Sequence, residues 1–247
     1  MTAQGRQRLD NALVERGLVE SREKAQRLIL ADEVLLNDQP ARKASQWVRP
    51  EDRLAVKAPE KFVSRGGHKL EHALREFGIK VTGLVATDLG ASTGGFTDCL
   101  LQHGAARVHA VDVGKGQLAH KLRSDARVIV HDGINARHLA RTTIGEPVDL
   151  VTIDVAFISL TLVLPAAYQL LKPGGKIVAL IKPQFEAGRA EVGRGGVVRK
   201  EEVRHRVVEK IRQFAVATLR ARVEGVVESP LLGPAGNREY LICIARP

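Results

Sequence analysis

Five short apolar runs in the middle of the chain each stop at a charged residue. They cover residues 84–87, 108–111, 128–131, 150–153 and 177–181. The charged residues that follow them are Asp88, Asp112, Asp132, Asp154 and Lys182. Uninterrupted apolar runs of this length are typical of parallel strands that are buried on both faces. Because ligands bind beyond the carboxyl ends of such strands, the pattern predicts five ionisable groups along one edge of a sheet.

Helical patterns alternate with these strands. Apolar residues at helical spacing predict a helix that begins near Gly66 and ends at Gly78. Further helices are predicted over residues 95–103, 160–171 and 201–219, and two more strands over residues 223–227 and 240–244. This alternation predicts an α/β fold with a doubly wound, mostly parallel sheet of seven strands.

The first 57 residues have a different pattern. Apolar spacing predicts one helix that ends at Gly17 and a second helix that is capped by Ser21. Two short strands are predicted over residues 34–36 and 53–56. Together these elements predict a small α+β module.

The change of pattern predicts two domains, residues 1–60 and 61–247, which are joined at Ala58-Pro59-Glu60. The chain carries a formal net charge of +10, which indicates a polyanionic partner such as nucleic acid. A basic protein with no such partner is the alternative. The positive excess lies mainly near residues 61–80 and 189–222, whereas the first domain is nearly balanced.

Several features bear on the cellular compartment. The two cysteines, Cys99 and Cys243, lie in apolar patterns and cannot build a disulfide framework, which favours a reducing cytoplasm. The chain starts without an apolar signal core, and no apolar run has the length of a membrane span. No Cys/His cluster has metal-ligand spacing. We expect a cytoplasmic protein with no membrane partner and no metal.

A glycine-rich turn follows the first of the five strands. Residues 88–96 read Asp-Leu-Gly-Ala-Ser-Thr-Gly-Gly-Phe, and glycines at such a turn let a ligand approach the backbone closely. Dinucleotide enzymes and S-adenosylmethionine methyltransferases share this layout, but Ser92 replaces the middle glycine of the dinucleotide fingerprint. A carboxylate at Asp88 would repel a pyrophosphate. The turn therefore favours S-adenosylmethionine as the cofactor.

We expect three carboxylates to bind different parts of this cofactor. Asp88 would meet the cationic methionine end, Asp112 the ribose hydroxyls and Asp132 the amino group of adenine. The turn would supply further contacts, from Gly90, Ala91, Ser92, Thr93, Gly94, Gly95 and Phe96. The alternatives are a tight turn with no ligand, and a strand that merely happens to end at Asp132.

The last two strand ends, Asp154 and Lys182, are candidates for the acceptor side. A ribose hydroxyl is a weak acid, so methyl transfer to it needs a base or a group that orients its lone pair. A lysine is a base only when neutral, and burial or a second cation such as Lys69 would lower its pKa. Asp154 and Glu239 would hold the two lysines in place. Taken singly, Lys69 and Glu239 are also typical of exposed surface residues.

These four residues resemble the Lys-Asp-Lys-Glu tetrad of the FtsJ-like ribose 2′-O-methyltransferases. Other passages resemble signatures of the TlyA family, also called hemolysin A, namely residues 64–70, 90–97, 112–118, 182–186 and 233–240. The similarity covers nearly the whole chain. It implies a Rossmann-like methyltransferase domain that methylates a cytidine ribose in ribosomal RNA with S-adenosylmethionine.

The first domain resembles the RNA-binding module named after ribosomal small-subunit protein four. The resemblance is carried by Arg8-Leu9-Asp10, Arg16-Gly17-Leu18, Ser21-Arg22, Lys24-Ala25 and Val34-Leu35-Leu36-Asn37. Asp32 and Asp38 stand where that family usually has glycine, and aspartate tolerates left-handed backbone better than most residues do. An S4-like domain implies that Arg8, Arg22 and Lys24 face RNA, with solvated surface positions as the alternative.

The second domain contains further candidates for RNA contact. Phe157 and Ser159 follow the strand that ends at Asp154, so they would lie near the target nucleotide, where Phe157 would stack on a base or else belong to the core. The stretch with Arg189 and Arg194 combines glycine with arginine and would form an RNA-binding lid, or else a solvated loop. Arg65 is a further basic candidate.

Three other functions compete with this interpretation. A non-catalytic RNA-binding or ribosome assembly factor would keep the fold without the reaction. A membrane-active hemolysin is suggested by the alternative family name, and a small-molecule methyltransferase by the cofactor site alone. The sequence leaves open which ribosomal subunit is modified, the number of sites, the placement of the domains and the oligomeric state.

Overall fold

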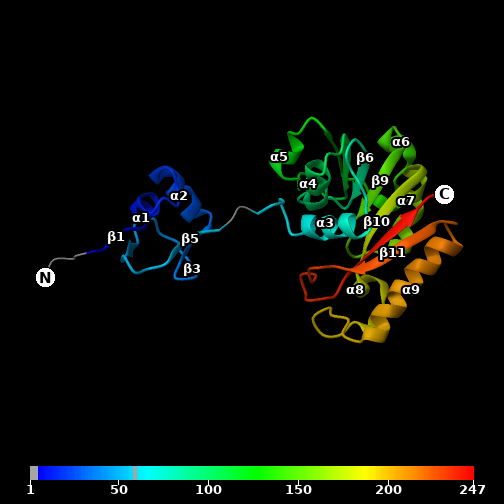
Figure 1. The fold of residues 1–247 in the computed structure, drawn as a ribbon. Helices are drawn as coiled ribbons and strands as arrows, with labels where there is room; N and C mark the ends of the chain where they lie inside the picture. Colours follow the sequence, from blue (N-terminus) through cyan, green and yellow to red (C-terminus); the bar gives the residue numbers. More distant parts are fainter. Residues whose placement is uncertain (1–4, 58–59) are drawn as a thin grey trace. The chain divides into compact units, whose positions relative to one another are not determined.

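The computed structural model describes residues 5–57 and 60–247, and it divides the chain into two compact units, residues 1–60 and 61–247 (Figure 1). Of the expected linker, Ala58 and Pro59 lie outside the described residues.

The N-terminal unit is a small α+β domain, which confirms the predicted class. Its elements are β1 (Gln7–Arg8), α1 (Leu9–Glu15), α2 (Arg22–Leu30), β2 (Val34–Leu36), β3 (Gln39–Pro40), β4 (Trp47–Val48) and β5 (Leu54–Val56). Strand β2 pairs antiparallel with β3 and β5, and β1 pairs antiparallel with β4. The core between these strands and the two helices contains Leu9, Leu13, Ile29, Val34 and Val48.

Two aspartates in this unit occupy backbone positions that favour glycine. The φ angle is +55° at Asp32, after α2, and +65° at Asp38, in the β2–β3 turn. Their short polar side chains make left-handed backbone tolerable. The left-handed backbone expected at these two aspartates is therefore present.

The C-terminal unit is built on a seven-stranded sheet. Its strands are β6 (Val85–Leu89), β7 (Arg107–Asp112), β8 (Val128–Asp132), β9 (Val148–Ile153), β10 (Leu171–Ile181), β11 (Arg222–Glu228) and β12 (Tyr240–Ala245). They lie in the order β11-β12-β10-β9-β6-β7-β8. All neighbours from β10 to β8 pair in parallel, whereas β12 pairs antiparallel with β10 and β11. The mostly parallel sheet confirms the predicted fold class.

Helices cover both faces of this sheet (Figure 1). They are α3 (Gly66–Glu76), α4 (Gly95–Gln102), α5 (His120–Arg123), η1 (Ala136–His138), α6 (Arg141–Ile144), α7 (Leu160–Leu170), α8 (Pro183–Glu186), η2 (Arg189–Glu191) and α9 (Glu201–Ala217). Apolar residues of α3, α4 and α5 pack in one core cluster, and those of α6, α7 and α9 pack in the other. The result is a three-layer, doubly wound domain.

The order of the strands reverses at β6. From β6 the chain moves outward through β7 to β8, and it then returns to place β9 on the other side of β6. Open α/β sheets bind ligands at the carboxyl ends of the strands beside such a switch point. The loops after β6 and β9 are therefore the structural setting of the site.

Candidate active site

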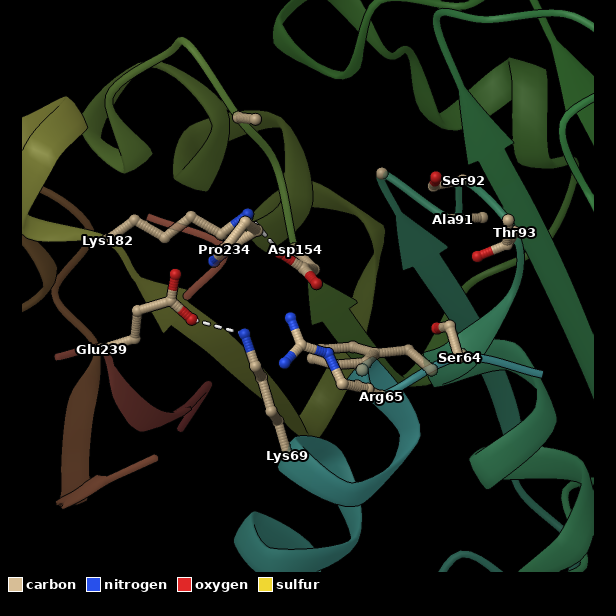
Figure 2. Close-up of a pocket in the computed structure, with 15 residues that line it drawn as sticks. Ser64, Arg65, Lys69, Ala91, Ser92, Thr93, Asp154, Lys182, Pro234 and Glu239 are labelled. Atoms are coloured by element: carbon tan, nitrogen blue, oxygen red, sulfur yellow. Dashed lines mark hydrogen bonds and ion pairs between the residues drawn. The ribbon is translucent and has the colours of Figure 1, made fainter. Parts of the chain in front are cut away.

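Two cavities adjoin each other at this switch point. Gly90, Ser92, Asp154 and Ala156 contribute to the walls of both. The first cavity has a volume of about 330 Å³, and its walls include Lys69, Lys182 and Glu239 (Figure 2). The second, of about 500 Å³, lies on the side of Asp112. All four residues of the expected tetrad therefore surround one space, beside the glycine-rich turn.

The four residues form two ion pairs across the first cavity. The ammonium of Lys69, on α3, lies 2.5 Å from Oε2 of Glu239, and that of Lys182 lies 2.6 Å from Oδ1 of Asp154 (Figure 2). Glu239 is fully buried, and Lys69 is almost so. Each lysine thus has its own carboxylate, which fixes the position of its ammonium group.

One oxygen of Glu239 has no partner. Its Oε1 is buried and accepts no hydrogen bond within the described part of the chain. A buried acceptor without a donor is costly, so this oxygen is available to a ligand that carries one. The carboxylate therefore has the capacity to hold Lys69 and a bound donor at the same time.

The glycine-rich turn approaches the end of β9 very closely. Gly90 has a φ angle of +83°, and a Cβ atom at this position would lie 2.5 Å from the carbonyl oxygen of Asp154. Gly94 has a φ angle of +100° at the start of α4. Neither position accommodates a side chain without strain, so both glycines are required for the shape of the site.

Asp112 lies at the wall of the second cavity and is held by the backbone. Its two carboxylate oxygens accept hydrogen bonds from the amides of Ser92 (2.8 Å) and Gly114 (2.7 Å). Each oxygen keeps a second lone pair. The apolar part of the same wall contains Val113, Ile134, Val155, Ile158 and Val163. A polar rim beside an apolar slot suits a nucleoside.

Comparison with known proteins gives a consistent result over both units. A family model described as FtsJ-like methyltransferase matches residues 62–246, and an S4 domain model matches residues 7–54. The chain is 47% identical over 239 residues to the 16S/23S rRNA (cytidine-2′-O)-methyltransferase TlyA of Mycobacterium tuberculosis, which covers 96% of this chain and 89% of that protein. The chain belongs to the TlyA family.

Other relatives extend the TlyA match. Hemolysin A of Brachyspira hyodysenteriae is 40% identical over 235 residues, which cover 95% of this chain and 98% of that one. A solved structure of a hemolysin-type protein from Streptococcus thermophilus is 41% identical, with a TM-score of 0.75 over 99% of this chain and 90% of the other. The TlyA family is a family of S-adenosylmethionine-dependent methyltransferases.

The structure does not place Asp88 at the cavity wall. Strand β6 continues to Leu89, so Asp88 is part of the strand, fully buried, and accepts hydrogen bonds from the hydroxyls of Thr97 (2.7 Å) and Thr152 (3.0 Å). Burial raises the pKa of this carboxyl to about 7. The expected direct contact with the methionine end of the cofactor does not fit this position, and Asp88 instead joins α4 to β9 beneath the turn.

Asp132 also lies outside the walls of both cavities. It accepts a hydrogen bond from the amide of Gly116 (3.1 Å) and forms an ion pair with Arg123 (2.8 Å). The ion pair with Arg123 holds the pKa of Asp132 below its usual range. In the second cavity the polar groups on this side are Gln117 and Asn135. Gln117 and Asn135 thus line the second cavity on this side, and Asp132 does not.

Phe157 and Ser159 have different surroundings. Phe157 is 91% exposed, lines the second cavity and has a φ angle of +62°. Its ring centroid lies 5.0 Å from that of Phe185. The hydroxyl of Ser159 donates to Glu186 (2.6 Å) and caps α7. Phe157 is therefore accessible to a ligand, whereas Ser159 serves the loop itself.

The predicted basic residues of the C-terminal unit are exposed. Arg65 precedes α3 and lines the first cavity (Figure 2), whereas Arg189 and Arg194 lie in the loop between α8 and α9. This loop is attached to the site through Asn237, which accepts from the amide of Val198 (2.9 Å) and donates to the carbonyl of Gly196 (2.8 Å). Its attachment point is thus two residues from Glu239.

The three basic residues predicted in the N-terminal unit all form ion pairs within that unit. Arg8 and Arg22 both contact the buried Asp10, at 2.9 Å, and Lys24 contacts Glu20 at 2.6 Å. Glu20 directly precedes the cap of α2, and both side chains of this pair are exposed.

Sequence reasoning missed several residues of the site. Gln117 and Asn135 line the second cavity, and Glu186 and Asn237 hold the surrounding loops. None of them ends an apolar run. Gln117, Glu186 and Asn237 are, however, part of passages that resemble TlyA signatures, and that resemblance is the one signal that pointed to them.

Among the described residues, no helix combines the length and the apolar character needed to cross a membrane. Within residues 5–57 and 60–247, no three side chains of His, Cys, Asp or Glu are grouped so as to hold a metal ion.

Replacing Asp88 by Asn should change how stability depends on pH. The pKa of about 7 in the folded protein, against an ordinary value of 3.8, means that the folded protein keeps a proton which the unfolded chain has lost. The wild type should therefore lose stability relative to Asp88→Asn as the pH rises from about 4 to about 7, by about 4 kcal/mol at most. Urea unfolding of both proteins over this range measures the difference.

Glu202→Gln is the matched control, because it removes an exposed carboxylate from the same unit, in the first turn of α9. Its stability relative to the wild type should stay level over this range. If the difference between Asp88→Asn and the wild type is equally level, Asp88 does not carry the raised pKa.

Proposed function

We propose that this protein transfers a methyl group from S-adenosylmethionine to the 2′-hydroxyl of a cytidine in ribosomal RNA. The observation that carries the proposal is the pair of lysine–carboxylate ion pairs around one cavity, Lys182 with Asp154 and Lys69 with Glu239, beside the glycine-rich turn. Ribosomal RNA and cytidine come from the names of the relatives, which are described as rRNA (cytidine-2′-O)-methyltransferases.

The residues around the second cavity fit the cofactor. Asp112 presents a free lone pair on each oxygen, which suits the two hydroxyls of a ribose, and Asn135 lies on the side where a base edge would follow. The apolar residues of the wall would pack against adenine. When bound, the cofactor supplies an electrophilic methyl group on a sulfonium sulfur. Gly90 lies in the walls of both cavities, so this donor would lie next to the tetrad.

The tetrad then divides the work on the acceptor. Lys182, in its neutral form, would take the proton of the 2′-hydroxyl while the methyl group passes from the sulfonium sulfur to that oxygen and leaves a neutral thioether. Asp154 fixes the position of Lys182 and stabilises the ammonium that forms. Lys69 places a second positive charge beside the developing oxyanion, and Glu239 holds Lys69 while its unpartnered Oε1 accepts a donor from the bound ligands.

The substrate RNA would reach this cavity along basic and aromatic side chains. Arg65 lies in the cavity wall, where a guanidinium suits the phosphate next to the target ribose. The exposed ring of Phe157 stands at the neighbouring cavity and would stack on a base. The net charge of +10 supports a polyanionic substrate.

Mapping of ribose methylation tests the proposed reaction. Ribosomal RNA from cells without this gene should lack at least one 2′-O-methylated cytidine, and the wild-type gene should restore it. The Lys182→Ala variant should not restore it, because loss of a general base costs about 100-fold or more in rate. Purified Lys182→Ala should still bind ribosomal RNA.

Lys80→Ala provides the matched control, since it removes an exposed lysine from the same unit, away from both cavities. It should restore methylation fully. A methylation map that is identical with and without the gene would contradict the proposal, and restoration by Lys182→Ala would contradict the role given to the tetrad.

The loop between α8 and α9 is proposed as an RNA-binding lid. Arg189 and Arg194 are exposed on it, and neither forms an ion pair within the described residues. The turn that presents Arg194 is closed by a hydrogen bond from the amide of Gly193 to the carbonyl of Val197 (3.0 Å). Because Asn237 attaches this turn beside Glu239, the two guanidinium groups would contact RNA that enters the cavity.

Replacing Arg189 and Arg194 together by Ala should weaken RNA binding and leave S-adenosylmethionine affinity unchanged. The slope of log affinity against log salt concentration should fall by about 1 for each lost phosphate contact. Filter binding at several salt concentrations and calorimetry with the cofactor measure the two quantities.

A second pair of exposed arginines is the control. Arg141 and Arg220 precede the starts of β9 and β11, at the edge of the sheet opposite the site. Their double replacement by Ala removes the same charge and should have a smaller effect on RNA affinity. Equal effects of the two pairs would show that only net charge matters and would exclude a lid.

A further inference from the structure

Trp47 is exposed although tryptophan is costly to expose. It is the single tryptophan of the chain and the only aromatic residue among the first 57. It lies on β4, and 63% of its surface is exposed. The next residue, Val48, is fully buried in the domain core. Leaving a large apolar ring in water is unfavourable, so its exposure on a short, defined strand indicates a contact surface.

The strand register places Trp47 beside Arg8. In the antiparallel β1–β4 pair, Arg8 is the partner of Trp47 and Gln7 is the partner of Val48. Directly opposite residues of an antiparallel pair project from the same face, and successive residues alternate between the faces. Since Val48 points into the core, Arg8 and Trp47 share the outer face.

Arg8 belongs to a cluster that is organised by a buried carboxylate. Asp10 is fully buried and accepts from Nε (3.0 Å) and Nη2 (2.9 Å) of Arg8 and from Nε of Arg22 (2.9 Å). The hydrogen bond from Arg8 is the main reason that the pKa of Asp10 lies far below its usual range. One carboxylate thus orders two guanidinium groups, and the cluster keeps an excess positive charge.

The outer nitrogens of both arginines remain available. Nη1 of Arg8 and the two terminal nitrogens of Arg22 make no hydrogen bond with any described residue. Both side chains are partly exposed. Guanidinium groups with free, ordered N–H donors suit phosphate oxygens. The cluster is therefore an anion-binding surface with an aromatic ring at its side.

This combination favours RNA over a protein partner. Single-stranded nucleic acid is bound by cationic groups that hold the backbone and by aromatic rings on which bases stack. An acidic protein segment would use the arginines but not the flat face of the indole. An unpaired base with its own phosphates uses both.

We propose that Trp47 stacks on an unpaired base of the RNA substrate while Arg8 and Arg22, ordered by Asp10, hold the adjoining phosphates. The proposal rests on the proposed function in taking the substrate to be RNA. To the RNA contacts expected of Arg8 and Arg22 it adds a base stacked on Trp47, and it gives Asp10 the role of a positioning residue.

Tryptophan emission of the full-length protein tests this site directly, because the only indole is the one in question. Two probes are titrated, an unmodified ribosomal RNA transcript and a short single-stranded oligoribonucleotide, while filter binding follows the affinity. Stacking should quench the emission in step with binding. A fully paired duplex of the same oligonucleotide should quench it less.

Variants separate stacking from general hydrophobic contact. Trp47→Ala should weaken RNA binding by about ten-fold, the usual scale for the loss of one stacked base, whereas Trp47→Phe should retain most of the affinity. Leu30→Ala is the matched control. Leu30 lies at the end of α2 and is the other strongly exposed large apolar residue of the N-terminal unit. It should bind RNA as the wild type does.

The role of Asp10 is tested by a double-mutant cycle. Asp10→Asn should weaken RNA binding in the wild-type background and have little further effect when Arg8 and Arg22 are both replaced by Ala. A purely structural role would instead add the same loss in both backgrounds. Circular dichroism of each variant shows whether the unit is folded.

The outcomes distinguish this inference from the proposed reaction. The stacking site would be overturned if Trp47 emission did not change on RNA binding, or if Trp47→Ala bound RNA with normal affinity. If the protein still methylated ribosomal RNA, the proposed reaction would remain intact. The site would be supported if RNA quenched the emission and Trp47→Ala lost affinity for RNA. If the same protein methylated no ribosomal RNA, the proposed reaction would be contradicted. Absence of quenching by every RNA probe would also overturn the site.

Discussion

The catalytic unit depends on one close backbone approach, between the turn after β6 and the end of β9. Gly90 lies so near the carbonyl oxygen of Asp154 that a Cβ atom would be only 2.5 Å from it. The amide of Asp154 donates to the carbonyl of Leu89 (2.9 Å), and the amide of Gly90 donates to the carbonyl of Val111 (2.9 Å). The ends of β6, β7 and β9 are thereby joined at one point.

In the proposed reaction, this contact decides how near the methyl donor can come to its acceptor. The residues that we propose to hold the cofactor lie after β6 and at the end of β7, whereas Asp154, which we propose for the acceptor side, follows β9. A side chain at position 90 would force these two groups of residues apart, and methyl transfer tolerates little extra distance between reacting atoms. The glycine is therefore a condition for joining two cavities into one site.

The antiparallel strand is the second condition. Strand β12 runs antiparallel to β10, and Ile181 and Tyr240 are cross-strand partners. The residue that follows Ile181 therefore lies beside the residue that precedes Tyr240. Lys182 and Glu239 meet in this way, although 56 residues separate them in the chain. A parallel β12 would have sent Glu239 to the opposite edge of the sheet. The single reversed strand thus supplies a buried carboxylate that five parallel strand ends cannot provide.

The apolar runs predicted Asp112, Asp154 and Lys182 at the carboxyl ends of their strands, and all three lie at the cavities. Asp132 ends β8 in the same way but lies outside both cavities, where it pairs with Arg123. The end of β6 was not predicted, because this strand continues through two buried polar residues, Thr87 and Asp88. The hydroxyl of Thr152, 64 residues away, satisfies this carboxylate, and no local pattern reveals such a partner.

Pairing between charged residues was equally hidden. Arg8 and Arg22 were expected to face RNA, and no local pattern showed that both also contact Asp10. A sequence shows which charges exist, but the tertiary structure decides which of them neutralise each other. In the same way, Ser159 follows the catalytic strand in sequence, but its hydroxyl is used by Glu186 and by the cap of α7. The position of a residue along the chain predicted that it lies near the site, but not that its side chain is available to a ligand.

The two segments that follow β9 and β10 are joined at several points. Asp154 pairs with Lys182, Phe157 packs on Phe185, and the amide of Leu160 donates to Glu186 (2.6 Å). The segment from 154 to 160 is thus held along its length by the segment from 182 to 186.

This attachment explains the unusual state of Phe157. A φ angle of +62° is unfavourable for an aromatic residue, and 91% exposure gives no burial to offset it. Strain of this kind persists only where the surrounding structure imposes it, and the joined segments on either side of Phe157 do so. The strained backbone holds an apolar ring in water at the second cavity, where the ring is accessible to a ligand. The strained backbone therefore supports a role in holding the substrate base, independently of any resemblance.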